Sequence, residues 1–339
     1  MNEESNPLPI RLSRDMNVKL QRADKTAPAW LVWSALWVVY LVWGSTYLAI
    51  RVVVETVPPL IAGGARFVAA GAIMQLVLMV RRGVKGVAVT GKEILACTLV
   101  GGALLLGGNG LVMVAEQSIP SGLAALVVAA VPLWVVVLRA MFGDRAPRAT
   151  LISVVVGFIG VGVLVLPGSA NGDASTAGIL TVVLASSFWA AGSFFSKRLP
   201  LPDDPFTSTT IQMLCGGLLC IVVGLLAGEG GRLNLEAIST SSIVALVYLV
   251  IAGSLLAFTA YTWLLQHAPI SKVATYAYVN PVVAIFLGWA LLDEPVTVAV
   301  AIGATIIVSS VAYIVRRESK PAPEVAELPP EPVAQGASR

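Results

Sequence analysis

The chain has 339 residues, of which 57% are hydrophobic and 12% are charged, and its formal net charge is only +3. Soluble domains carry roughly twice this fraction of charged residues, so the composition excludes an ordinary soluble protein and predicts a bundle of membrane spans. Three cysteines lie inside apolar segments, and an odd number without a pairing pattern predicts neither a disulfide framework nor a metal site. They are Cys97, Cys215 and Cys220.

The two ends of the chain are polar. Residues 1–28 contain five lysines and arginines and do not have the layout of a signal peptide, so we interpret them as a basic cytoplasmic tail. Residues 316–339 are rich in proline, glutamate and alanine, a composition that predicts a second, disordered cytoplasmic tail.

Between the tails, ten apolar segments are long enough to cross a bilayer, which takes about 20 residues per helix. Because lipid cannot satisfy the hydrogen bonds of the backbone, each segment must be a helix. The sequence therefore predicts an all-α membrane protein with ten transmembrane helices. The segments cover residues 29–50, 59–80, 94–115, 121–142, 149–166, 177–196, 206–227, 242–265, 271–292 and 296–315.

The distribution of positive charge predicts the orientation. Lysine and arginine concentrate in cytoplasmic loops and tails of membrane proteins. If both termini are cytoplasmic, 19 of the 22 lysines and arginines fall on the inner side, and only Arg51 and Arg232 fall outside, with Arg66 within the second segment. We therefore expect a multi-pass protein of the plasma (inner) membrane with both termini in the cytoplasm.

The chain also repeats itself. Residues of the first half recur 146 positions later, and a second set recurs after 149, so residues 29–166 and 177–315 are two copies of one five-helix unit. The pairs are Trp43 with Trp189, Arg51 with Lys197, Pro59 with Pro205, Gly71 with Gly217, Gln117 with Gln266, Pro120 with Pro269, Pro132 with Pro281 and Asp144 with Asp293. Because five is odd, the second copy enters the membrane from the opposite side. Such inverted repeats place a substrate near the midplane between the copies.

Several motifs resemble the EamA branch of the drug/metabolite transporter superfamily over residues 30–315. They are the Trp-Gly-Ser-Thr-Tyr run from Trp43, Gly108-Asn109-Gly110, Ala115-Glu116-Gln117, Pro120-Ser121-Gly122, and the run from Tyr276 to Val283. The resemblance implies a central cavity lined by the first, third, fourth, sixth, eighth and ninth helices. It also implies export, because the branch contains exporters of amino acids, of other metabolites and of toxic cations.

Aromatic and polar side chains within the spans are candidates for substrate binding. Trp43 and Tyr47 lie one turn apart and share a helix face, and Trp189 and Ser193 repeat that spacing. Aromatic faces can hold an apolar or cationic group, although tryptophan and tyrosine near span ends also form interfacial belts. The remaining candidates are Asn109, Phe258, Tyr276 and Asn280.

Two prolines fall about halfway along their helices, at equivalent positions of the repeats. Pro132 and Pro281 each remove a backbone hydrogen bond and free the carbonyl four residues earlier. They either improve packing through a kink or let the fourth and ninth helices gate the cavity, and both interpretations can hold.

No aspartate or glutamate falls at mid-span, whereas proton or sodium coupling usually requires such a residue. Glu116 and His267 are interpreted as interfacial caps, so facilitated diffusion is favoured over a buried proton relay. Arg66 either snorkels to the interface, pairs with Glu55 or faces substrate, and Arg51 with Glu55 reads equally well as a surface pair.

The sequence offers no sign of catalysis or of a cofactor. The run from Gly86 to Lys92 imitates a phosphate-binding loop, but Glu93 replaces the Ser/Thr that would hold magnesium and no strand precedes it, so no ATP site is expected. We predict no metal, cofactor or nucleic-acid partner and no enzyme activity. The predicted function is secondary transport by alternating access that exports small amphipathic metabolites, most of all amino acids, aromatic or other neutral ones among them. The alternative is efflux of drugs or toxic quaternary cations.

Overall fold

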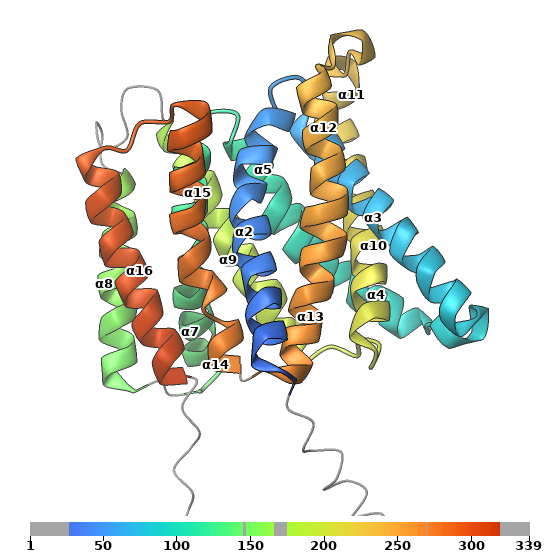
Figure 1. Cartoon of the computed structure of the whole chain (residues 1–339), viewed down its shortest axis with the longest axis horizontal. Coiled ribbons are helices and arrows are strands. Elements are labelled where there is room, and N and C mark those ends of the chain that lie inside the picture. The colour runs from blue at the N-terminus through green and yellow to red at the C-terminus, as the bar shows by residue number, and fades with distance from the viewer. Residues whose placement is uncertain (1–26, 145–146, 166–174, 269, 319–339) are drawn as a thin grey trace, which may run out of the picture.

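The structure is a computed structural model that describes residues 27–144, 147–165, 175–268 and 270–318. The two predicted tails therefore lie almost wholly outside the described residues. The described secondary structure is entirely helical (Figure 1). Within it, eight helices are long and apolar enough to cross a membrane and two more are apolar but shorter, so the prediction of an all-α, ten-helix membrane protein is confirmed.

The first repeat supplies five spans, of which the third and fourth are each built from consecutive helical pieces. They are α2 (Ala29–Val53), α3 (Pro59–Arg82), α4 (Gly91–Gly101) continued by the π-helix η2 (Gly102–Gly110) and α5 (Leu111–Ala115), α6 (Ser121–Val128) with α7 (Val131–Met141), and α8 (Arg148–Val165). A short 3₁₀ turn, η1 (Val84–Val87), follows α3.

The second repeat supplies the other five spans, with the eighth and ninth divided in the same way. They are α9 (Thr176–Ser196), α10 (Pro205–Leu226), α12 (Thr240–Tyr248) continued by the π-helix η4 (Leu249–Leu256) and α13 (Ala257–His267), α14 (Ile270–Val273) with α15 (Tyr276–Leu292), and α16 (Val298–Glu318). The short helices α11 (Glu229–Arg232) and η3 (Leu235–Ala237) join α10 to α12.

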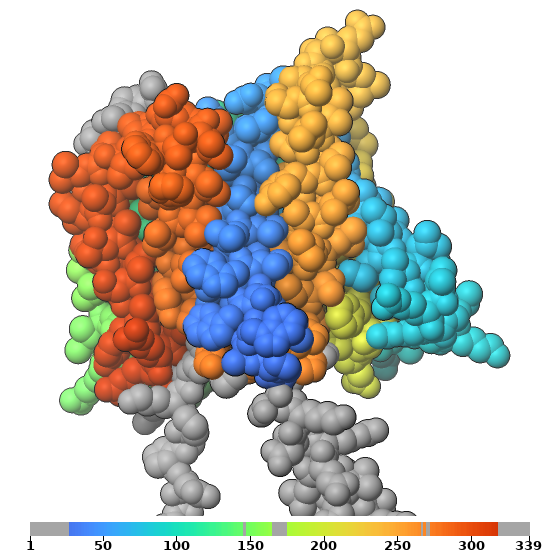
Figure 2. All heavy atoms as spheres, viewed as in Figure 1, coloured from blue at the N-terminus to red at the C-terminus, as the bar shows by residue number. Residues whose placement is uncertain are grey.

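The helices form a central group flanked by two pairs. The pair α3 and α10 lies on one side of the bundle and the pair α8 and α16 on the other, and α2, α9, α13 and α15 lie between them (Figure 1). Each flanking pair joins equivalent helices of the two repeats. On the face seen in Figure 2, α2 packs closely between α15 and the α12–α13 span. The start of α2 and the end of α16 lie at the same end of the bundle.

Small residues allow the flanking pairs to approach closely, as is usual for helices in lipid. A Cβ on Gly64 of α3 would lie 2.7 Å from the carbonyl oxygen of Gly217 on α10, and one on Gly217 would lie 2.9 Å from the backbone nitrogen of Val68. In the other pair, a Cβ on Gly160 of α8 would lie 2.8 Å from Ile306 of α16. Glycine is therefore required where the repeats meet.

The two mid-helix prolines affect their spans differently. The fourth span is interrupted at Ala129–Ala130, and α7 then begins at Val131 with Pro132 as its second residue. In the ninth span Pro281 lies inside the continuous helix α15, and the interruption comes earlier, at Ala274–Thr275. The fourth and ninth spans are thus both divided, but only the fourth is divided beside its proline.

Candidate functional site

Three of the predicted substrate-binding residues belong to one aromatic cluster, which joins the two repeats. Trp43 of α2 lies 5.0 Å from Tyr261 of α13 and 5.3 Å from Tyr276 of α15, measured between ring centroids. Tyr261 and Tyr276 lie 5.6 Å apart, and Phe258 lies 6.4 Å from Tyr261. We call these four residues the aromatic cluster. Trp43 comes from the first repeat and the other three from the second, so relative motion of the repeats must change the cluster.

The indoles of both repeats contact π-helices. The Nε1 of Trp43 donates a hydrogen bond of 3.2 Å to the carbonyl of Gly253 in η4. Trp189 lies against η2, where a Cβ on Gly108 would be 2.7 Å from its ring. In each case the tryptophan of one repeat contacts the π-helix of the other. Single-turn π-bulges occur frequently at functional sites because the extra residue re-aims the side chains that follow it.

The other predicted residues are distributed around these contacts. Tyr47, one turn after Trp43, is half-buried and within electrostatic range of Tyr276 and Glu116. Asn280 is buried one turn after Tyr276, and its Oδ1 has no hydrogen-bond partner. Asn109 and Ser193 are half-buried, with Trp189, on the segments where η2 packs against α9.

Arg66 of α3 is buried instead of snorkelling to the interface. Its side chain is 4% exposed, and its Nε donates a hydrogen bond of 2.9 Å to Ser254 Oγ of η4. The snorkelling interpretation is therefore wrong, and the partner is Ser254 and not Glu55. The guanidinium also lies 4.8 Å from the ring centroid of Phe67, and Nη1 has no hydrogen-bond partner.

Glu116 is the C-cap residue of α5, at the end of the third span. Glu116 is fully buried, and neither of its carboxylate oxygens has a hydrogen-bond partner. Burial raises the pKa of its carboxyl well above the ordinary value, the nearby Glu294 raises it further, and Arg51 opposes the shift. Glu116 therefore lies at a span end, as predicted, but it is buried within the protein.

Arg51 explains part of this burial. Its Nη1 donates a hydrogen bond to the backbone carbonyl of Glu116 and therefore ties the end of α2 to the end of α5. Glu55, one turn further on, is exposed. The contact with Glu116 replaces the expected surface pair. His267 does lie at a span end, where its exposed ring stacks on Trp263 at 4.5 Å.

Comparisons with known proteins agree with the duplicated, all-helical architecture. The model of the EamA-like transporter family matches the chain twice, over residues 30–166 and 176–316. The chain belongs to the EamA-like transporter family. It is 35% identical over 285 residues to the "Uncharacterized inner membrane transporter YedA" of Escherichia coli strain K12, covering 84% of this chain and 90% of that protein.

Two further similarities are informative. A "Probable amino-acid metabolite efflux pump" of Salmonella typhimurium strain LT2 is 27% identical over 282 residues, covering 80% of this chain and 90% of that protein. A solved crystal structure aligns with a TM-score of 0.57 and 21% sequence identity over 84% of this chain and 98% of that chain, which shows the shared fold. This EamA-family chain is therefore a multi-pass membrane transporter.

Two glutamates of the second repeat cap helices of the first in this EamA-family chain. Glu229 accepts hydrogen bonds from the backbone nitrogens of Leu60 and Ile61, at 3.2 and 2.9 Å, at the start of α3. Glu294 accepts them from Ser121 and Gly122, at 2.7 and 3.0 Å, at the start of α6. The first N–H groups of a helix have no partner within the helix and favour negative charge. Both carboxylates therefore hold the repeats together at the end of the bundle opposite the start of α2 and the end of α16.

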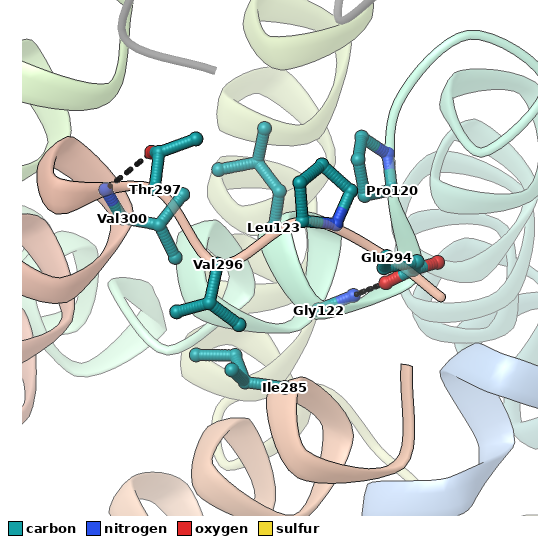
Figure 3. A pocket seen from close by; sticks show the side chains of 9 residues that line it. Pro120, Gly122, Leu123, Ile285, Glu294, Val296, Thr297 and Val300 are labelled. Carbon is teal, nitrogen blue, oxygen red and sulfur yellow. Dashed lines mark hydrogen bonds between the residues drawn. The ribbon is translucent and has the colours of Figure 1, made fainter. Parts of the chain in front are cut away.

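A small pocket lies beside the second of these caps (Figure 3). Its walls are mostly apolar, and its one carboxylate, Glu294, is already committed to the start of α6. We therefore assign this pocket to the contact between α6, α15 and α16 and not to substrate. It is lined by Pro120, Gly122, Leu123, Ile285, Glu294, Pro295, Val296, Thr297 and Val300.

Sequence reasoning missed Tyr261, the burial of Arg66 and Glu116, and both capping glutamates. Tyr261 had a signal, because it follows Phe258 by three residues and so lies near it on the same helix. The glutamates had none, because Glu229 and Glu294 cap helices about 170 positions earlier in the chain.

Proposed function

We infer that this EamA-family transporter exports small amphipathic metabolites, amino acids above all and aromatic or other neutral ones among them, by alternating access between its two five-helix repeats. The observation that carries the proposal is the aromatic cluster, because its rings come from both repeats. A site made by both repeats can be opened to one side or the other when they move. The Salmonella relative described as a probable amino-acid metabolite efflux pump supports the choice of cargo.

Substrate counterflow with the purified full-length protein in liposomes tests this proposal. Vesicles are loaded with one unlabelled amino acid at a time, and uptake of the same labelled amino acid is followed, with protein-free vesicles as the control. We expect overshoot with aromatic and other neutral amino acids. Overshoot only with quaternary cations, such as tetraethylammonium, would replace the proposal by its alternative, efflux of toxic cations.

The proposed direction, outward, requires an orientation. We place the end of the bundle that holds the start of α2 and the end of α16 in the cytoplasm, because the lysines and arginines favour that side. Exposed residues at the two ends allow a test: Lys197→Cys and Glu236→Cys, each in a background with the three native cysteines replaced. In intact cells a membrane-impermeant maleimide should label Glu236→Cys and spare Lys197→Cys, and the reverse pattern would invert the assignment.

A further inference from the structure

Arg66 is a buried cation without a counter-ion. It lies seven residues beyond the start of α3, about 10 Å along the helix at 1.5 Å per residue, and is 4% exposed. Charged residues within a span are costly and face the interior of the bundle or a functional site. No carboxylate lies within ion-pair distance of Arg66 in the described part of the chain, and its Nη1 makes no hydrogen bond.

The guanidinium lies next to the aromatic cluster, on the same stretch of η4. A Cβ on Gly253 would lie 3.1 Å from Arg66 Nη2, and the carbonyl of Gly253 accepts the hydrogen bond from Trp43. The next residue, Ser254, binds Arg66 Nε. Two adjacent residues of η4 therefore bind the two groups: Gly253 accepts from the indole of Trp43, and Ser254 accepts from the guanidinium of Arg66.

We propose that Arg66 binds the carboxylate of the transported substrate while the aromatic cluster holds its apolar part. This assignment rests on the proposed function and narrows it to carboxylate-bearing compounds. A guanidinium offers paired N–H donors that match a carboxylate, and Nη1 is a donor that still lacks an acceptor. One guanidinium neutralises one negative charge, so a monoanionic carboxylate suits the site better than a phosphate dianion.

The same charge argues against a permanently cationic substrate. An arginine stays protonated in proteins, and two like charges repel strongly where water is excluded. Other charged groups at this end of the bundle include Glu229, which already accepts two backbone hydrogen bonds at the start of α3, and Glu116 and Arg51, at the ends of α5 and α2. Burial raises the pKa of Glu116 and so favours its neutral form, whereas Arg66 keeps its charge. The charged group that contacts η4 beside Trp43 is the guanidinium of Arg66, which is positive.

Binding to the purified full-length protein tests the proposal with two probes that share a phenyl ring. The first, 3-phenylpropionate, has a carboxylate and no amine; the second, L-phenylalaninamide, has an amine and no carboxylate. Quenching of tryptophan fluorescence in detergent gives each Kd. We expect the wild-type protein to bind 3-phenylpropionate at least about tenfold more tightly than the amide, which is the effect of roughly one charge-assisted contact.

Variants then locate the contact. Arg66→Gln should weaken binding of 3-phenylpropionate at least about tenfold and leave the amide unchanged or improved, and Arg66→Lys should be intermediate. Arg82→Gln, on the same helix but at a side chain 39% exposed, is the matched control and should bind as the wild type does. Gly253→Ala, which crowds Nη2, should also weaken the carboxylate probe.

Equal affinity of the wild-type protein for the two probes would overturn the proposal even if no Arg66 variant folds, and so would an unchanged Kd for 3-phenylpropionate in folded Arg66→Gln. The proposed function fails separately, when no amino acid gives counterflow. Binding of 3-phenylpropionate that depends on Arg66 would then still support a carboxylate site for another class of cargo.

Discussion

Trp43 and Trp189 occupy equivalent positions in the two repeats, and each contacts the π-helix of the other repeat. Their surroundings differ. Trp43 has ring contacts with Tyr261 and Tyr276, and η4 beneath it also holds Arg66, whereas Trp189 lies against glycine in η2. The helices of the two repeats are therefore equivalent, whereas the side chains around the two tryptophans differ.

The ionisable groups show the same asymmetry. Arg66 corresponds by the 146-residue offset to Gln212, which is half-buried and donates to Ser208, and Glu116 corresponds by the 149-residue offset to the exposed Leu265. Buried charge thus belongs to the first repeat alone in both pairs. The paired helices of the two repeats are alike, whereas the groups proposed to bind substrate, one cation and one aromatic cluster, occur once.

The largest expected effect separates the two tryptophans. Trp43→Ala removes the ring that the first repeat adds to the aromatic cluster; burial of the substrate against that ring is worth about 3 kcal/mol, so we expect amino-acid counterflow to fall about 100-fold. Trp189→Ala should reduce it less than about tenfold. The measurement is the initial rate in proteoliposomes at equal protein content. Equal losses in the two variants would mean that the repeats contribute equally to binding.

The next effect concerns the capping glutamates, which both belong to the second repeat. Glu229→Ala and Glu294→Ala each leave two backbone N–H groups without their acceptor, so each should lower the free energy of unfolding by about 2 kcal/mol. Thermal unfolding in detergent measures the loss. The exposed Glu236→Ala is the control and should be neutral; a similar loss there would point to net charge and not to capping.

A smaller, pH-dependent effect is expected at Glu116. Because its folded-state pKa is raised, the protonated carboxyl favours the fold: the contribution is complete below the unfolded pKa of about 4.3 and is lost as the pH rises toward the folded value. Glu116→Gln cannot ionise, so the variant does not lose this stability as the pH rises. Unfolding measured from pH 5 to pH 8 should show the variant gaining on the wild type by at most ~1.4 kcal/mol per pH unit. A constant difference across that range would contradict a raised pKa.

The smallest effect is expected where the repeats meet through exposed charges. Arg82 of α3 lies 2.6 Å from Asp204 at the start of α10, with side chains 39% and 33% exposed. Arg82→Gln should cost less than about 1 kcal/mol, and the cost should shrink at high salt because exposed pairs are screened. Unfolding at low and high salt measures it. A loss of unfolding free energy equal to that of Glu294→Ala would show that exposed ion pairs and buried hydrogen bonds between the repeats contribute equally.

Hydropathy was sufficient to predict the spans, because lipid constrains helix length and composition strongly. The search for aromatic and polar side chains within the spans identified Trp43, Tyr276 and Phe258, which the structure brings together. The interruption of the ninth span at Ala274–Thr275 was not predictable from Pro281, because where a helix divides depends on its neighbours as well as on the missing N–H.

The buried charges were missed for a related reason. Arg66 binds Ser254, 188 positions later in the sequence, and the buried Glu116 is contacted by Arg51, 65 positions earlier. Local periodicity carries no information on contacts of this kind. The assignment of the eight predicted binding residues to substrate stays a prediction, as do the domain boundaries and the gating role of Pro132 and Pro281.

The pairing of α3 with α10 and of α8 with α16 has a consequence for how the chain must be made. Each half of the sequence is a repeat, and glycines on both halves, such as Gly64, Gly217 and Gly160, approach the other half closely. The halves therefore resemble the subunits of a heterodimer joined in one polypeptide, because each buries part of its surface against the other. The connection between residues 165 and 175 keeps their ratio at one to one and their effective concentration high.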